Sequence, residues 1–377
     1  MQRSFVNQLV KRFTASDPLI HVIMGPRQVG KTTGILQFLE EYTGTYHYAS
    51  ADGKLTSDYA WLTEQWQATL LKGSDALLVI DEVQKIENWA ELIKKLWDDQ
   101  KIKKTRLRLI LSVSSSLSLE LGITESLAGR LEIIQVAHWD YCETKILAQL
   151  SLNDYLKYGG YPKSYEFLSD EARWYQYLQQ AIINRVIDKD ILQYAHVEKP
   201  ALFKQAFEII CCYPAQEISY RKLLGQIQDK GNVELIKRYL ELFESAFLIK
   251  TLQKYHNQAI TVKSSSPKII LLAPCLYTLA SIKEEKSAFI FESTVGAKLL
   301  QLSDKLYYWR DNNDEVDFVL VWRGRLFAVE VKSGRKRRAN GLQKFQSRFP
   351  QAICIIISVD NYDIFIENPA DFLEKLI

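Results

Sequence analysis

The feature that most constrains this 377-residue chain is GPRQVGKT, residues 25–32, between an apolar run and a helix-forming segment. The apolar run, residues 19–24, is short enough to be a buried parallel strand. Glycines at 25 and 30 allow backbone N–H groups to wrap a phosphate, and Lys31 supplies an ammonium for the β- and γ-phosphates. A strand-to-helix turn that binds nothing is the alternative, but the flanking elements favour a phosphate loop. The predicted ATP contacts here are Gly25, Pro26, Arg27, Gln28, Val29, Gly30, Lys31, Thr32 and Thr33.

A second apolar run, ALLVIDEVQ at residues 76–84, ends in two adjacent acids. In nucleotide hydrolases Asp81 would hold Mg²⁺ through water, with Thr32 as a direct ligand, and Glu82 would orient or deprotonate the attacking water. A strand followed by a solvated acidic turn is the alternative. Because a complete phosphate loop lies about fifty residues upstream, we predict ATP hydrolysis with Mg²⁺ as cofactor.

Two further positions are candidates for contact with the nucleotide. A strand at residues 107–113 ends in a serine cluster, where Ser112 and Ser114 either sense the γ-phosphate or form an ordinary turn. Arg130 follows a helix that ends at Gly129. It either reaches the nucleotide of a neighbouring subunit, which would imply a homo-oligomer, or forms a salt bridge.

Composition places the chain among folded proteins of several domains, with 47% hydrophobic and 25% charged residues and a net charge of +3. No apolar run has the length of a membrane span, and the N-terminus lacks a secretory segment. It instead predicts an amphipathic helix with Phe5, Leu9, Val10 and Phe13 on one side. Five cysteines without metal-ligand spacing indicate reduced thiols, so we expect a cytoplasmic protein without membrane contact.

Strands and helices alternate over the first third, which predicts an α/β domain with a parallel sheet between two layers of helices. Farther along, residues 155–191 have a helical pattern. The charged residues Asp188, Lys189 and Asp190 fit a solvated cluster better than a functional one. Residues 200–275 give helix, turn, helix and two strands, the outline of a winged helix. Glutamates accompany Lys237 and Arg238 on its second helix, which favours a structural role over reading duplex DNA.

The motifs GPRQVGKTT, LLVIDEVQ and ESLAGRLE together resemble a prokaryotic AAA+-type, archaeal-ATPase-like family whose members end in a nuclease-like domain of unknown function. GGYPKSYEF, VIDKDI, YYWRDNNDEVDFVL and FAVEVKSG extend the resemblance over nearly the whole chain. It departs at Val113 and at residues 268–276, where the family has a Gly and an aromatic-Asp-Gly signature. The resemblance implies a P-loop NTPase domain at 1–142, a helical lid at 143–199, a winged-helix-like domain at 200–278 and a smaller α/β nuclease-like domain at 279–377.

The last of these segments has the spacing D-x12-E-x-K, formed by Asp317, Glu330 and Lys332 on a predicted hairpin that turns at residues 323–324. Period-two geometry puts Glu330 and Lys332 on one face. This resembles the PD-(D/E)xK nucleases, which implies Mg²⁺ on Asp317 and Glu330 and a water activated by Lys332. Glu292 resembles the additional metal-binding acid, and Gln343 is a weaker candidate.

A basic stretch follows this motif. From Lys332 through Arg348 there are seven basic residues and no acidic one. Such a run binds polyanions or forms a solvated helix start, and its proximity to the carboxylates favours DNA. We therefore predict an ATP-driven protein that acts on DNA and carries a nuclease-like module. The alternatives are an ATP-dependent oligomerising switch whose last domain binds nucleic acid or protein without cutting, and a remodeller of protein partners.

Overall fold

The computed structural model describes residues 3–13, 19–53, 58–114, 127–193, 195–197, 199–227, 232–256, 266–280, 286–334 and 340–377. The chain forms two compact units. Unit 1 comprises residues 1–137 and 184–195, and unit 2 comprises residues 138–183 and 196–377. None of the helices in the described residues combines the length and apolar composition needed to cross a lipid bilayer.

Unit 1 contains a five-stranded sheet in the order β2-β3-β4-β1-β5, and every neighbouring pair is parallel. Its strands are β1 (Ile20–Met24), β2 (Tyr46–Ser50), β3 (Leu77–Asp81), β4 (Arg108–Val113) and β5 (Leu131–Gln135). β1 and β3 are buried along their whole length, as their continuous apolar runs predict. The predicted parallel α/β sheet is therefore confirmed.

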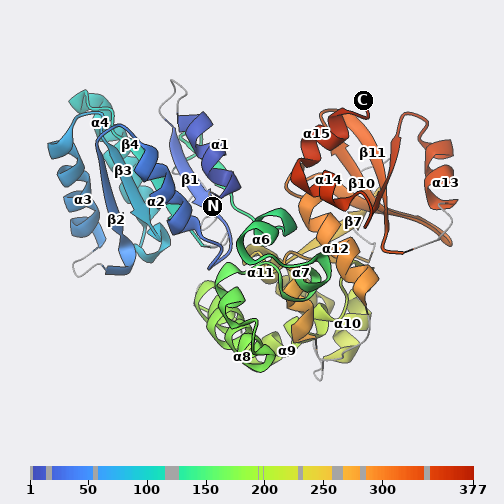
Figure 1. Ribbon diagram of the computed structural model, residues 1–377. Helices are drawn as coiled ribbons and strands as arrows, with labels where there is room; N and C mark the ends of the chain where they lie inside the picture. The colour runs from blue at the N-terminus through green and yellow to red at the C-terminus, as the bar shows by residue number, and fades with distance from the viewer. Residues whose placement is uncertain are drawn as a thin grey trace. The chain divides into compact units, whose positions relative to one another are not determined.

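Helices cover both faces of this sheet (Figure 1). They are α1 (Ser4–Phe13), α2 (Lys31–Glu41), α3 (Asp58–Lys72) and α4 (Trp89–Lys103), with short turns η1 (Ala51–Gly53) and η2 (Val83–Lys85). Across the sheet, the connection from β1 to β2 runs in one direction and the later connections run in the other. Because such connections are right-handed, α2 lies on one face of the sheet and α3 and α4 lie on the other. The predicted N-terminal amphipathic helix is α1, which packs on α2. It buries Phe5, Leu9 and Phe13 as predicted, but Val6 is buried in place of Val10, which is half-buried.

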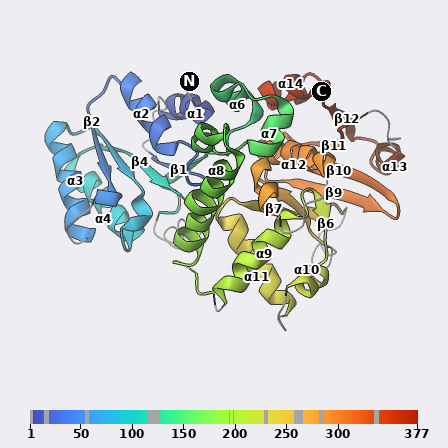
Figure 2. The same cartoon turned by 60° about the horizontal axis from the view of Figure 1, so that its bottom comes forward.

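Unit 2 contains a seven-stranded mixed sheet in the order β12-β11-β10-β9-β7-β8-β6 (Figure 2). Its strands are β6 (Gln216–Glu217), β7 (Ile249–Lys254), β8 (Lys268–Leu271), β9 (Leu306–Asp311), β10 (Asp314–Trp322), β11 (Arg325–Lys332) and β12 (Ile353–Ser358). The predicted hairpin is β10–β11. It turns at Arg323 and Gly324, which both have positive φ values of 48° and 75°, as the tight two-residue turn requires.

The helical segments of unit 2 surround this sheet. They are α6 (Tyr141–Ala148), α7 (Leu152–Tyr158), η3 (Pro162–Phe167), α8 (Glu171–Gln176), η4 (Tyr177–Ile183), α9 (Pro200–Cys211), α10 (Tyr220–Gln226), α11 (Val233–Ser245), η7 (Pro274–Leu279), α12 (Ser287–Leu299), α13 (Asn340–Arg348), α14 (Tyr362–Glu367) and α15 (Pro369–Glu374). One apolar core lies between the sheet and α12, and a second lies under α13 on the opposite face.

The strands expected for a winged helix share a sheet with the C-terminal strands. β7 pairs in parallel with β9 through Gln253 and Tyr307 and through Lys254 and Tyr308. β8 in turn pairs with β7, and α12 packs on β8. The sequence did not indicate this pairing, because strand partners far apart in the chain are chosen by tertiary packing. On α11, Lys237 pairs with Glu234 and Arg238 with Glu241, in keeping with a structural role.

The close approach of α13 to β10 predicts a stability effect at Gly341. A Cβ at this position would lie 1.9 Å from the Glu315 carbonyl oxygen, so Gly341→Ala forces backbone apart and destabilises unit 2 by about 1–3 kcal/mol. Calorimetric melting of the full chain measures this effect.

Gly225→Ala is the matched control. Gly225 lies within α10 with no atom near an added Cβ, so alanine there stabilises by roughly 0.5–1 kcal/mol. Equal melting temperatures for Gly341→Ala and the unmodified chain would contradict this prediction, because they would show that α13 can move away from β10 at no cost in stability.

Candidate active site

The predicted phosphate loop connects the end of β1 to the start of α2, at the carboxyl edge of the unit 1 sheet. Its two glycines are required for different reasons. Gly30 has φ of 87°, in the left-handed region. Gly25 has ordinary backbone, but an added Cβ would lie 2.1 Å from the Val136 carbonyl oxygen. Close packing against the residue after β5 therefore explains Gly25, a reason that the motif alone did not indicate.

Lys31 lies at the first turn of α2 and is buried. Its Nζ donates to the carbonyl oxygens of Gly25 at 2.9 Å and Pro26 at 2.7 Å. Burial lowers the pKa of the ammonium to about 8, against the opposing effect of Glu82, Asp190 and Asp81. Within the loop, the Lys31 ammonium donates only to neutral oxygens. Its charge is therefore suited to binding an anionic ligand.

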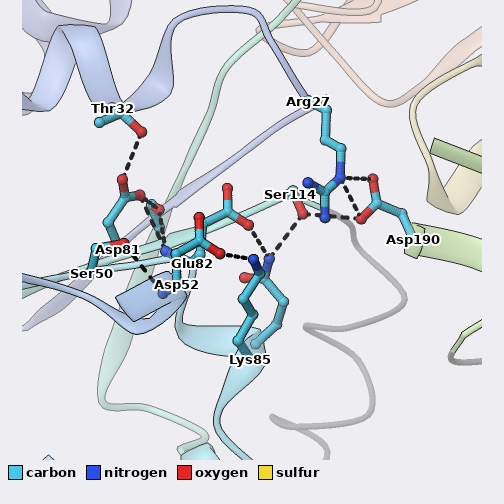
Figure 3. Close-up of polar contacts among 11 residues, drawn as sticks. Arg27, Thr32, Ser50, Asp52, Asp81, Glu82, Lys85, Ser114 and Asp190 are labelled. Atoms are coloured by element: carbon cyan, nitrogen blue, oxygen red, sulfur yellow. Dashed lines mark hydrogen bonds and ion pairs between the residues drawn. The ribbon is translucent and has the colours of Figure 1, made fainter. Parts of the chain in front are cut away.

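Asp81, at the end of β3, accepts hydrogen bonds from hydroxyl groups of three neighbouring elements. Figure 3 shows its contact with Thr32. Its Oδ2 accepts from Thr32 Oγ1 at 2.6 Å and from Tyr48 Oη at 3.0 Å, and its Oδ1 accepts from Ser112. Thr32 follows the phosphate loop, so the hydroxyl and the carboxylate predicted to share Mg²⁺ are already in contact. These oxygens form a donor set that suits a hard divalent cation.

Glu82 occupies left-handed backbone with φ of 55°, which a non-glycine residue rarely adopts. Its N–H donates to Ser112 Oγ at 2.9 Å. Its carboxylate accepts from Gln84 Nε2, and that same amide donates to Ser114 Oγ at 2.9 Å. The contacts therefore turn the predicted general base toward the predicted sensor residues and hold it there.

The network continues from Ser114 to Asp190, in η5 (Val186–Ile191) of unit 1. Ser114 Oγ donates to Asp190 Oδ1 at 3.3 Å, and Arg27 of the phosphate loop donates to both carboxylate oxygens at 2.6 and 2.8 Å (Figure 3). Asp190 is 2% exposed, so the prediction of a solvated cluster is wrong for this residue, although Asp188 and Lys189 are exposed. Burial raises the pKa of Asp190, while Arg27 acts in the opposite direction.

Arg130 lies away from these groups. Its guanidinium forms two bonds with Asp98 of α4, at 3.1 and 3.2 Å. This is the salt bridge that the sequence left as one alternative, and a role toward a second subunit stays a prediction.

Sequence reasoning missed Tyr48, Gln84 and the buried position of Asp190. Tyr48 lies in the middle of β2, opposite Val79 of β3, and its side chain is long enough for the hydroxyl to reach Asp81 at the end of β3. Strand order was the missing information. Asp190 had no signal, because a helical charged residue faces solvent or core according to the packing around it.

The carboxylates predicted for the C-terminal module lie in unit 2. Glu330 and Lys332 share one face of β11 and pair at 2.5 Å, in agreement with the period-two prediction. Asp317 Oδ2 accepts from the Val331 N–H at 2.7 Å. Glu292 on α12 pairs at 2.5 Å with Lys268 of β8. The sequence did not indicate this partner. In the described part of the chain, no group of three His, Cys, Asp or Glu side chains is arranged to hold a metal ion.

The basic stretch is only partly described, because residues 335–339 lie outside the described ranges. Of the rest, Lys344 pairs with Asp314 at 3.0 Å and with Asp311 at 3.2 Å, and Arg348 lies 4.0 Å from Asp311. Gln343 lies on α13, and its metal role stays a prediction.

Family comparison divides the chain into three matched segments. Residues 17–145 match a family described as an AAA domain. Residues 149–286 and 288–369 match two domains of unknown function, DUF8612 and DUF4143. The first match covers both the phosphate loop and the carboxylate strand.

Three individual proteins are similar to this chain. An uncharacterized protein of Methanocaldococcus jannaschii is 24% identical over 327 residues, which cover 80% of this chain and 72% of that protein. The Walker-type ATPase PABY2304 of Pyrococcus abyssi matches with a TM-score of 0.52 and 14% identity over 74% of this chain and 95% of that chain. AMPPCP-bound DnaA from Aquifex aeolicus covers 63% of this chain and 85% of its own, with 15% identity and a TM-score of 0.32.

The AAA match and the fold of the Pyrococcus ATPase support the same assignment for the segment that contains the site. Residues 17–145 are therefore similar to AAA domains in sequence, and the fold is similar to that of a Walker-type ATPase.

Proposed function

We propose that the chain binds and hydrolyses ATP at the carboxyl edge of the unit 1 sheet. The observation that carries this proposal is the 2.6 Å contact between Thr32 Oγ1 and Asp81 Oδ2, at the end of a loop with a buried lysine. In a P-loop hydrolase these two oxygens serve the Mg²⁺ that accompanies the triphosphate. A turn without a ligand has no need for either the lysine or the carboxylate.

The other residues have separate roles in this proposal. Backbone N–H groups of residues 25–33, except Pro26, which has none, and the Lys31 ammonium bind the phosphates. Asp81 and Thr32 would hold Mg²⁺, which neutralises phosphate charge when bound. Glu82 orients water for attack on the γ-phosphate. The hydrogen bonds of Ser112 and Ser114 fix the position of Glu82. Arg27 joins the loop to Asp190.

We further propose that DNA is the polyanion on which the ATPase acts. The basis is the sequence from Lys332 to Arg348, which has seven basic residues and no acidic one. The pairing of Lys344 and Arg348 with Asp311 weakens their share of this positive charge.

An ATP-controlled switch is the second candidate. A series of hydrogen bonds runs from Glu82 through Gln84 and Ser114 to Asp190. It favours the switch because it connects the predicted catalytic residue to η5. A ligand that moves Arg27 or Glu82 would therefore alter a helical segment of the same unit.

Two substitutions separate binding from hydrolysis. Lys31→Ala removes the ammonium that faces the phosphates and lowers ATP affinity by about tenfold or more. Glu82→Gln keeps the fold of the loop, leaves affinity within about twofold, and lowers kcat by roughly 10²–10⁴-fold. Equilibrium binding of a fluorescent ATP analogue and steady-state phosphate release measure the two effects.

Glu87→Gln is the matched control, because Glu87 is exposed beyond the carboxylate strand. Equal hydrolysis by Glu82→Gln and Glu87→Gln would reject the assigned base. The same assay with duplex DNA tests the DNA proposal: we expect faster hydrolysis that returns to the basal rate as salt is raised. An unchanged rate at low salt would reject DNA as the partner and leave the ATPase assignment intact.

Affinity for ATP should depend on pH through Lys31. The pKa of its ammonium in the free protein is about 8, so the charge is present below that pH and lost above it. The bound triphosphate favours the charged form, and affinity therefore stays constant from pH 6.5 to 7.5 and falls by about tenfold near pH 9. Titration calorimetry in two buffers of different ionisation enthalpy should also show proton uptake on binding at pH 8.5. A flat affinity across this range would contradict the assignment.

The switch candidate predicts a role for Asp190. Asp190→Asn removes the charge that holds Arg27, so an ATP-dependent change in molar mass seen by light scattering should weaken or vanish. Asp188→Asn makes the same chemical change at an exposed position of the same segment and should leave the response intact. A chain whose molar mass does not respond to ATP would reject the oligomerising switch.

A further inference from the structure

A buried lysine lies at the centre of the carboxylates of unit 2. Lys268, the first residue of β8, is 0% exposed. Its Nζ lies 2.5 Å from Glu292 Oε1 of α12, 3.3 Å from Glu315 Oε1 of β10 and 3.9 Å from Asp317 Oδ1 of β10. The lysine therefore brings together carboxylates from a helix and a strand that are distant in the sequence.

The ammonium of Lys268 is in contact with acceptors and an aromatic ring. Its Nζ donates to Glu315 Oε1 at 3.3 Å and to the Asp317 carbonyl oxygen at 3.2 Å. Glu292 Oε1 lies 2.5 Å from Nζ as an ion-pair partner, without hydrogen-bond geometry. The Phe318 ring lies 5.1 Å from Nζ and adds a cation–π contact.

The surroundings of Lys268 suit a charged ammonium, because a charge buried away from water needs opposite charges beside it. The carboxylates of Glu292, Glu315 and Asp317 are in that position. Arg310, paired with Glu315, adds a second cation at the edge of the cluster.

A divalent metal does not fit among these groups. Mg²⁺ requires oxygens at about 2.0–2.1 Å, with two carboxylates facing one centre. Here Glu292 and one oxygen of Asp317 face the Lys268 ammonium, and the other oxygen of Asp317 accepts from the Val331 N–H. Glu330 Oε1 faces Lys332, while Glu330 Oε2 is buried without a hydrogen-bond partner but joins no group of three such side chains among the described residues. A metal on Glu292 and Asp317 would lie against the buried Lys268 ammonium.

We propose that the Lys268 ammonium is the resident cation of this carboxylate cluster and takes the place of a divalent metal. The cluster then fastens β8 to α12 and β10, and the module does not cleave phosphodiesters by a metal-dependent route. The C-terminal module is accordingly a binding and structural unit. This inference is independent of nucleotide hydrolysis in unit 1, so either one can fail alone.

Mn²⁺ binding to the nucleotide-free full chain tests the inference directly. Electron paramagnetic resonance counts bound Mn²⁺ in the unmodified chain and in Asp317→Asn. We expect equal counts, because no metal uses Asp317. One site that is present in the unmodified chain and lost in Asp317→Asn would overturn the inference.

Removal of the lysine should create the missing metal response. Lys268→Met keeps the unbranched shape of the side chain, one atom shorter, but leaves the carboxylates without their cation. The melting temperature therefore falls, and Mn²⁺ restores it by at least about 3 °C. Lys298→Met is the matched control, because Lys298 of α12 is half-buried and pairs at 2.6 Å with a single carboxylate, Asp140. We expect no such rescue in this control or in the unmodified chain.

A Mn²⁺ response of equal size in Lys298→Met and Lys268→Met would contradict the inference. If Lys268→Met does not fold, the Mn²⁺ counts of the unmodified chain and of Asp317→Asn are sufficient to decide the question. Nicking of supercoiled DNA with Mg²⁺ or Mn²⁺ provides a further readout. The unmodified chain and Lys332→Ala should both leave the DNA intact, and cleavage by the unmodified chain alone would reject the proposal.

Discussion

The contact between Thr32 and Asp81 depends on the order of strands in unit 1. β1 and β3 flank β4, and all three end at the same edge of a parallel sheet. The loop after β1, the carboxylate that ends β3 and the serine of β4 therefore converge without a long side chain bridging them. Every other group of the site, including Glu82 and Arg27, is positioned by this convergence.

The chain contains two buried lysines whose surroundings give them opposite properties. Lys31 is held by neutral carbonyl oxygens, and burial lowers its pKa. Lys268 is held by carboxylates, which raise its pKa. The first keeps a strong attraction for an anion that enters the loop, and the second already has its counter-charges. We therefore propose that the buried lysine of unit 1 binds a ligand and that the buried lysine of unit 2 stabilises the fold.

Glu82 combines strained backbone with a carboxylate already engaged by Gln84. Backbone strain at a predicted catalytic position persists only where neighbours hold it, and Ser112 and Gln84 are those neighbours. The contacts from Gln84 through Ser114 to Asp190 give this position a physical connection to η5. Geometry of this kind suits both the hydrolase and the switch, since either one requires Glu82 to respond to the nucleotide.

The sequence by itself determined the parallel sheet, the phosphate loop, Lys31 and the pair Asp81 and Glu82, because these features follow from short-range patterns of apolar runs, glycines and charges. It also placed Glu330 and Lys332 on one face of a strand. Tertiary structure alone decided that Asp190 is buried against Arg27, that β7 pairs with β9 and that Lys268 lies among Glu292, Glu315 and Asp317. These contacts join residues far apart in the chain, and their partners are selected by packing and by the need to neutralise buried charge, which no local pattern encodes.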